Sequence, residues 1–416
     1  MSKIERVLEK LKELDLVAFV VGSGDAHQSE YVHECDMRRA YLTEFTGSSG
    51  TALTVNVDKL RNGYLWTDGR YFLQASQQLS PEWELMKSGE PNVLEINDWI
   101  IANLSSDSRV GVDPRLISAS QALSMQKQFQ PYGIVLVAAS VNPVDIVWGA
   151  DRPAAPKKPI NVHSLELAGV SHNDKILSVQ NELAKTKSSA FIVTMLDEIA
   201  WLLNIRGSDV SYNPVIISYA VVTATDCHYF VNKDKLSPTI ESHLASAGVI
   251  IHDYAGIDSF LTSFITSNAG NVLVDLSQIN WHIYELVKDR VHAAVSPITL
   301  MKALKNEAES KGIRESHIRD GVALTAFLHH LENTIKNTTT SHPYTEYDLA
   351  IELETFRSRM PLHVSPSFGT IAGYGANGAI IHYKPEEKTA AVVGTDSMLL
   401  LDSGAQYKDG TTDVTR

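Results

Sequence analysis

The chain has 416 residues, of which 44% are hydrophobic and 20% are charged, a composition typical of folded globular domains and not of disordered chains. At roughly 150 residues per domain, this length predicts about three domains. Its 36 Lys and Arg residues face 49 Asp and Glu residues, which gives a net charge of −13. This balance argues against a nucleic-acid partner, because nucleic-acid binding needs a basic surface that displaces counterions.

The first 16 residues carry charges throughout, and their apolar residues recur at helical spacing. They therefore predict an amphipathic helix and not a signal peptide. No stretch of the sequence approaches the roughly 20 apolar residues that span a membrane. The two cysteines, Cys35 and Cys227, leave one disulfide open but fit a reducing compartment more simply. We expect a cytoplasmic protein without membrane association.

Strands alternate with helices in the region that follows. Apolar runs predict strands, and the segments between them predict helices at 71–79 and 119–130. The strand-like runs are 16–21, 51–57, 63–67, 110–112 and 134–138. This alternation predicts an α/β domain over residues 1–155. A stiff segment rich in proline and lysine, 151–159, then predicts a linker.

Residues 156–300 repeat features of the first region. Residues 41–48 read YLTEFTGS and residues 201–208 read WLLNIRGS, an offset of 160 positions. Residues 110–113 read VGVD and residues 272–275 read VLVD, an offset of 162 positions. Each match alone is weak and coincidence stays open, but two matches at nearly one offset favour a duplicated α/β domain. Gly47 would then correspond to Gly207, and Asp113 to Asp275.

The last region, 301–416, has a different pattern. A charged helical stretch covers 301–336, and a second helix is expected over 346–360 with Thr345 as its N-cap. The remainder is rich in glycine and strand-like, with apolar runs at 379–383 and 398–401. Together these elements predict an α+β domain.

Two aspartates near the end of this region suggest a metal site. Asp402 ends a buried apolar run, where a carboxylate is costly unless it is paired or binds a cation. Asp413 follows in a Thr-rich segment, and a hairpin centred between Tyr407 and Lys408 would set the two carboxylates side by side. A tight turn at Asp409-Gly410 would instead offset this register. Paired carboxylates bind hard divalent ions. A polar hairpin with one capping and one solvent-facing aspartate stays open as the alternative.

The sequence resembles the long, three-domain Xaa-Pro aminopeptidases (aminopeptidase P) of the cytosolic type. Residues 402–416, DSGAQYKDGTTDVTR, carry the likeness most specifically, together with NGAIIHY at 377–383 and TDGRYF at 67–72. Further matches occur in order along almost the whole chain. They are CD at 35–36, LDEIAW at 196–201, RGSDV at 206–210, NPV at 213–215 and KN at 305–306.

This resemblance implies two duplicated creatinase/prolidase-type α/β domains, 1–155 and 156–300, before a pita-bread metallopeptidase domain at 301–416. It also implies release of the N-terminal residue from short peptides with proline in second position, through water activated by two manganese ions. Asp402 and Asp413 would be metal ligands, His382 a catalytic residue that also contacts substrate, and Arg70 a substrate-binding residue. A surface salt bridge to Asp68 is the alternative role for Arg70. A homodimer is a candidate assembly.

The family's remaining ligands, one His and two Glu, lie downstream of the second aspartate, and this sequence ends three residues after Asp413. The resemblance therefore implies that the pita-bread domain is partial here. We expect the 416 residues to be inactive on their own. The alternative is a non-catalytic fragment that acts by binding or by dimerisation.

Overall fold

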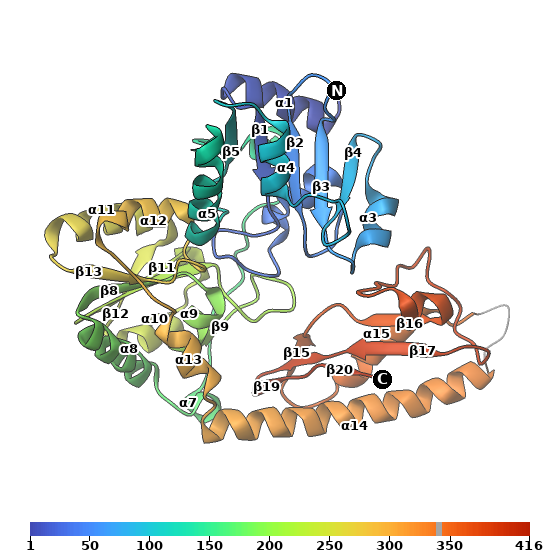
Figure 1. The fold of residues 1–416 in the computed structure, drawn as a ribbon. Helices are drawn as coiled ribbons and strands as arrows, with labels where there is room; N and C mark the ends of the chain where they lie inside the picture. Colours follow the sequence, from blue (N-terminus) through green and yellow to red (C-terminus); the bar gives the residue numbers. More distant parts are fainter. Residues whose placement is uncertain (338–342) are drawn as a thin grey trace. The chain divides into compact units, whose positions relative to one another are not determined.

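The computed structural model describes residues 1–337 and 343–416 (Figure 1). The chain forms two compact units. The first contains residues 1–161, 172–211 and 215–302, and the second contains 162–171, 212–214 and 303–416. The first unit holds two α/β regions, each built on its own six-stranded sheet.

The sheet of the first region has the strand order β4-β3-β2-β1-β5-β6. Its strands are β1 Ala18–Val21, β2 Thr51–Val55, β3 Gly63–Thr67, β4 Trp83–Lys87, β5 Arg109–Val112 and β6 Val135–Ala138. Its helices are α1 Lys3–Glu13, α2 Arg38–Thr43, α3 Phe72–Gln78, α4 Ile96–Asn103, α5 Ala119–Phe129 and α6 Pro143–Trp148. The expected amphipathic helix is present as α1, which begins at a capping box between Ser2 and Glu5.

The second region repeats this topology. Its six-stranded sheet has the strand order β12-β11-β10-β8-β13-β14. Parallel and antiparallel neighbours follow one another as in the sheet of the first region. Its strands are β7 Asn161–Val162, β8 Ser188–Val193, β9 Ile205–Arg206, β10 Ser218–Thr223, β11 Cys227–Val231, β12 Val249–Asp253, β13 Asn271–Val274 and β14 Val291–Ala293. Its helices are α8 His172–Thr186, α9 Leu196–Leu202, α10 Pro238–Ala245, α11 Ile257–Ser267, α12 Trp281–Val287 and α13 Pro297–Ala303. The predicted duplication is confirmed, with Asp113 after β5 and Asp275 after the equivalent β13.

The two copies meet through reciprocal backbone hydrogen bonds. Ala119 N donates to Ile279 O and Trp281 N donates to Ile117 O, both at 2.9 Å. The next pair is also reciprocal, since Ser120 N donates to Leu276 O and His282 N donates to Pro114 O, both at 2.8 Å. Each bond is matched by its counterpart 162 residues away. The copies are therefore joined as two subunits of a two-fold dimer are, through the same segment of each.

The second unit packs two helices against short strands. It contains α7 Leu165–Ala168, α14 Glu307–Asn337 and α15 Glu346–Arg357. One three-stranded sheet has the order β15-β18-β19 and the other β16-β17-β20. These strands are β15 His363–Pro366, β16 Ile371–Tyr374, β17 Leu399–Ser403, β18 Ala405–Tyr407, β19 Gly410–Thr411 and β20 Val414–Thr415. Phe327 of α14, Leu349 of α15 and Leu401 of β17 are among the residues of its apolar core.

One prediction for this unit is confirmed and one is wrong. Thr345 caps α15, and its hydroxyl accepts a hydrogen bond from Asp348 N. The single helical stretch predicted at 301–336 is instead interrupted between Ala303 and Glu307. Asn306 causes the break because its side chain accepts from Glu309 N at 2.9 Å, while the Glu309 carboxylate accepts from Asn306 N at 3.0 Å. This reciprocal pair starts a new helix.

A half-buried acid–base pair makes this unit sensitive to pH. The distance between Oε1 of Glu354, on α15, and Nε2 of His363 is 3.0 Å. Burial raises the pKa of Glu354 to about 7 and lowers the pKa of His363. The protonated carboxyl can then donate to the neutral imidazole, whose Nε2 otherwise has no hydrogen-bond partner within residues 1–337 and 343–416.

The sign of the pH dependence follows from this pair. Between about pH 4.5 and 7 the folded chain keeps a proton on Glu354 that the unfolded chain has lost, so Glu354 makes the unfolding free energy fall as pH rises. The lowered pKa of His363 acts in the opposite sense below its ordinary value of 6.5, and the Glu354→Gln variant isolates the effect of Glu354. Glu354→Gln should gain about 1–2 kcal/mol relative to wild type between pH 4.5 and 8, after allowance for solvent screening. Thermal melts at both pH values measure the difference. Glu315→Gln removes the carboxylate of an exposed ion pair with Lys311 and should show no such gain in unfolding free energy. Equal gains for the two variants would contradict the raised pKa of Glu354.

Candidate metal and substrate site

The C-terminal strands form a hairpin whose register differs from the prediction. Tyr407 pairs with Gly410, so Lys408 and Asp409 form the turn. The hairpin is thus centred between Lys408 and Asp409, and not between Tyr407 and Lys408. As a result Asp402 lies directly opposite Thr415, and Asp413 is not its direct partner.

The position of Asp413 relative to Asp402 follows from this register. Asp413 lies immediately before β20, in which Thr415 is the partner of Asp402. If the strand continued to Asp413, the two aspartates would be diagonal neighbours, a relation in which Cα atoms are about 7–8 Å apart. The direct pairing is absent, and a metal site shared by the two carboxylates stays a prediction.

The surroundings of Asp402 fit a cation ligand. Its Oδ1 atom is buried and has no hydrogen-bond partner among the described residues. A buried carboxylate oxygen without a partner is costly, and a divalent ion would satisfy it. Asp413 is exposed and thus open to a ligand from solvent. The two carboxylates fit part of a hard-cation site.

Close packing against α14 fixes the hairpin turn. A Cβ at Gly312 would lie 2.3 Å from Asp409 O, and a Cβ at Gly410 would lie 2.3 Å from Ser316 Oγ. Arg319, further along the same helix, forms an ion pair with the Asp409 carboxylate. The contact anchors the turn residue and hence the register of the aspartate-bearing strands. Sequence analysis missed it, although these three α14 residues recur at spacings of four and three, on one helix face.

Glycine is also required where the two halves of the hairpin cross. Gly404 separates β17 from β18, and a Cβ there would lie 2.0 Å from Thr412 O and 2.4 Å from Ser367 Oγ. Any side chain would push the strands apart. The Asp-Ser-Gly sequence that begins at Asp402 therefore has a packing role as well as a proposed ligand role.

His382 lies on a turn and not on the strand predicted at 379–383. A 3₁₀ helix, Gly375–Ala379, follows β16, and Tyr383 N then donates to Ile380 O at 3.1 Å. The segment folds around the fully buried carboxylate of Glu346, which accepts from Asn377 Nδ2 and, at 2.7 Å, from Tyr383 OH. These bonds to a buried acid outweigh the strand propensity. His382 itself is exposed, with a φ of 59°.

Arg70 lies in the first α/β region, after β3. Its Nε and Nη2 donate to the two carboxylate oxygens of Asp68, each at 2.8 Å. This bidentate bond lowers the pKa of Asp68 to about 2. The salt bridge that sequence analysis kept as an alternative is thus present. The Arg70 side chain is 42% exposed, so part of its guanidinium remains open to a further ligand.

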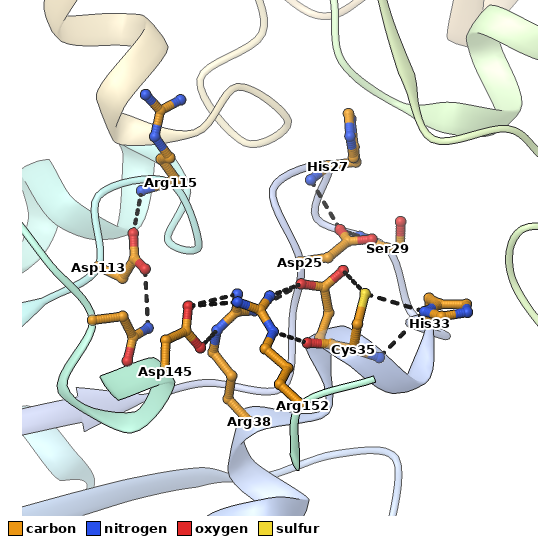
Figure 2. A network of polar contacts seen from close by, with 12 residues as sticks. Asp25, His27, Ser29, His33, Cys35, Arg38, Asp113, Arg115, Asp145 and Arg152 are labelled. Carbon is orange, nitrogen blue, oxygen red and sulfur yellow. Dashed lines mark hydrogen bonds and ion pairs between the residues drawn. The ribbon is translucent and has the colours of Figure 1, made fainter. Parts of the chain in front are cut away.

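The surroundings of Cys35 do not suit a nucleophilic thiol. It is buried, His33 Nδ1 lies 3.1 Å from its sulfur, and the sulfur lies 3.6 Å from Asp36 Oδ2 (Figure 2). Burial and Asp36 together raise the pKa of the thiol to about 11. The neighbouring Arg38 and Arg152 are held by the Asp145 carboxylate in the same network. The surroundings of Cys35 are those of a structural polar network.

The described residues contain neither a membrane-spanning helix nor a cluster of three metal-ligating side chains. No helix within residues 1–337 and 343–416 combines the length and the apolar composition needed to cross a membrane. Over the same residues, no three His, Cys, Asp or Glu side chains gather closely enough to hold a metal ion by themselves.

Comparison with known families defines the class of protein. Residues 3–146 and 151–309 each match a Creatinase/Prolidase N-terminal domain, and residues 311–416 match Metallopeptidase family M24. The chain thus combines two creatinase-type α/β domains with a segment of Metallopeptidase family M24, in agreement with the fold expected from the sequence.

Individual relatives narrow this class. The chain is 41% identical over 430 residues to a protein of Neosartorya fischeri named "Probable Xaa-Pro aminopeptidase P", and 41% identical over 418 residues to one of that name from Laccaria bicolor. All of this chain is covered in both matches, and it spans 64% of the length of each relative.

A solved structure indicates the same family as these relatives. X-prolyl aminopeptidase from Caenorhabditis elegans, described as a cytosolic enzyme with a di-nuclear active site, matches all of this chain and 69% of its own length. Its TM-score is 0.93 and its identity is 34%. The chain belongs to the Xaa-Pro aminopeptidase P family.

Proposed function

We propose that this chain is part of a metalloaminopeptidase that releases the N-terminal residue from short peptides with proline in second position. The observation that carries this proposal is the Oδ1 of Asp402 within the M24 segment, which is buried and has no hydrogen-bond partner among the described residues. Family membership supports the activity, and the di-nuclear site described for the nematode relative supports a pair of metal ions. Manganese is the proposed metal.

Each site residue has a proposed role. Asp402 and Asp413 hold the ions, which when bound supply an activated water. His382, exposed on its turn, donates a hydrogen bond to the carbonyl oxygen of the scissile bond as negative charge develops there. Arg70 donates to a carbonyl or carboxylate of the peptide through the part of its guanidinium that Asp68 leaves open. Selectivity for proline rests on a tertiary amide that lacks an N–H and on a ring that needs a shaped apolar pocket.

Domain limits, location and assembly are part of the same proposal. We place the domains at 1–155, 156–300 and 301–416, close to the three matched ranges. A cytoplasmic location is supported by the cytosolic nematode relative. Homodimerisation can be tested by light scattering of the purified chain.

A polypeptide of these 416 residues should bind manganese weakly and hydrolyse Xaa-Pro peptides negligibly. Two carboxylates provide only part of the roughly six ligands that a hard cation takes. Metal analysis after dialysis, with a turnover assay on Arg-Pro-Pro, measures both properties. Full occupancy together with rapid cleavage would contradict this prediction.

The role of Arg70 is tested in the polypeptide translated from the complete reading frame that contains these residues. Arg70→Ala should raise KM for Arg-Pro-Pro about tenfold, the effect of losing one charge-assisted hydrogen bond. Arg61→Ala is the matched control, because Arg61 also forms an exposed ion pair, with Glu84 at 3.3 Å. If both variants behave like wild type, Arg70 serves only the salt bridge to Asp68.

A further inference from the structure

A cavity lies in the first α/β region, at the carboxyl ends of β1 and β5. Its volume is about 570 Å³, within the range of small-molecule sites. From β1 the chain moves outward to β2, β3 and β4, and then returns to β5 on the other side of β1. The cavity therefore lies where the strand order reverses, the place at which open α/β sheets commonly bind ligands.

In the second α/β copy the buried side chain of Glu198 lies at the equivalent place. There the Glu198 carboxylate accepts hydrogen bonds from Ser296 Oγ at 2.7 Å and Gln278 Nε2 at 3.4 Å. Gln278 corresponds to Leu116 at the offset of 162 residues, and Ser296 corresponds to Asn142 because each immediately precedes the helix after the last strand of its sheet. Leu116 and Asn142 both line the cavity of the first copy.

The connection after the first strand accounts for part of this difference. In the second copy, residues 194–195 join β8 to α9, so that the helix bearing Glu198 follows at once. In the first copy, residues 22–37 join β1 to α2, and residues 22–24 and 28–30 of this longer connection line the cavity. The duplicated fold has thus diverged at this position.

The cavity is lined by apolar and uncharged polar side chains together, with two acidic side chains and one basic one. Leu116 and Met125 are among its apolar residues. Its charged residues are Glu30, Asp113 and Arg70, and Arg70 is already paired with Asp68. The lining therefore favours a cation over an anion. Among the described residues no three His, Cys, Asp or Glu side chains gather closely enough to hold a metal ion, so an organic cation fits better than a divalent ion.

Asp113 is the carboxylate best placed to hold such a cation. Its Oδ1 accepts from Arg115 N at 3.0 Å and its Oδ2 accepts from Asn142 Nδ2 at 2.9 Å (Figure 2). These bonds fix its orientation and leave lone pairs on both oxygens for a ligand. Glu30, by contrast, is exposed. A preoriented carboxylate loses less entropy when it binds.

We propose that this cavity binds a small primary amine with an apolar body, whose ammonium group donates to Asp113 while the body packs against Leu116 and Met125. The cavity shares Arg70 with the residues proposed to bind the peptide substrate, whereas Asp113, Leu116 and Met125 have no role in the proposed peptidase centre.

Isothermal titration of the 416-residue chain with 3-methylbutan-1-amine at pH 7.5 tests the proposal. One equivalent should bind, whereas 3-methylbutan-1-ol should bind about tenfold more weakly because it lacks the charge. The isosteric anion 3-methylbutanoate should give no measurable heat. Leucinamide and the tripeptide Leu-Pro-Pro then distinguish a free small amine from a peptide N-terminus. Equal affinities for amine and carboxylate, or no binding of the amine, would overturn the proposal.

The duplication provides a matched control. Asp113→Asn should weaken amine binding about tenfold. Asp275→Asn removes the equivalent carboxylate, which accepts from Ser277 N at 3.0 Å and from Ser296 N at 3.1 Å, and should leave binding unchanged. Thermal melts show whether each variant remains folded. Equal affinities of the two variants would show that Asp113 does not hold the ammonium.

A second pair of variants tests the location without altering charge. Ser124→Phe places a bulky side chain at a cavity-lining position of α5 and should abolish binding. Gln126→Phe, on the same helix but outside the lining, should bind like wild type. Amine binding by Ser124→Phe at wild-type affinity would place the ligand elsewhere.

Discussion

Replacing Asp402 with asparagine in the polypeptide translated from the complete reading frame is expected to reduce kcat for Arg-Pro-Pro by about 10³-fold or more. A metal ion at such a site contributes several kcal/mol to stabilisation of the transition state, and each 1.4 kcal/mol corresponds to about tenfold in rate. The same change should lower the bound manganese content, because the amide lacks the negative charge of the ligand.

The matched control for this variant is Glu387→Gln, which removes an exposed carboxylate of the same unit. It should retain both metal and turnover. If Asp402→Asn keeps its full metal content and activity, Asp402 is not a ligand, and its buried oxygen must be satisfied in another way.

Replacing Arg357 with methionine is expected to lower the unfolding free energy of the second unit by about 3–5 kcal/mol. Arg357 and Asp320 are almost completely buried, with side-chain exposures of 1% and 2%. Arg357 Nε donates to Asp320 Oδ1 at 2.8 Å, and Nη2 donates to Oδ2 at 3.0 Å. Loss of one partner leaves the other charge buried and unpaired, which is much more costly than the pair itself.

Chemical denaturation measures this effect. Lys336→Met is the control, since Lys336 and Glu332 form an exposed pair on α14 whose loss should cost no more than about 0.5 kcal/mol. The double variant Arg357→Met with Asp320→Leu should recover much of the loss, because neither charge then remains buried. A small effect of Arg357→Met alone would contradict this account of the core.

The sequence predicted the fold well where its signals were local or repeated. The apolar runs at 51–57 and 63–67 correspond to β2 and β3, and Thr345 caps the helix expected after it. The offset of 160–162 residues predicted the duplication, because equivalent structural positions had kept similar residues. The reciprocal hydrogen bonds between the copies were not predictable, since they join backbone atoms and leave no mark on residue type.

Predictions failed where distant contacts outweighed local preference. The hairpin register depends on α14, in which Gly312 and Arg319 hold the turn residue Asp409 almost a hundred positions away. The segment around His382 folds about the buried carboxylate of Glu346 and does not extend as a strand. The cavity beside Asp113 was also missed, because it depends on a comparison of two connections in three dimensions and not on a motif.

Product analysis by mass spectrometry tests the proposed activity most directly. The polypeptide from the complete reading frame, supplied with manganese, is incubated with Arg-Pro-Pro and with Arg-Ala-Ala. The proposal predicts free arginine and Pro-Pro from the first peptide, no cleavage of the second, and loss of both products after chelation. Equal cleavage of the two peptides, or cleavage that survives chelation, would contradict a metal-dependent peptidase selective for a proline in second position.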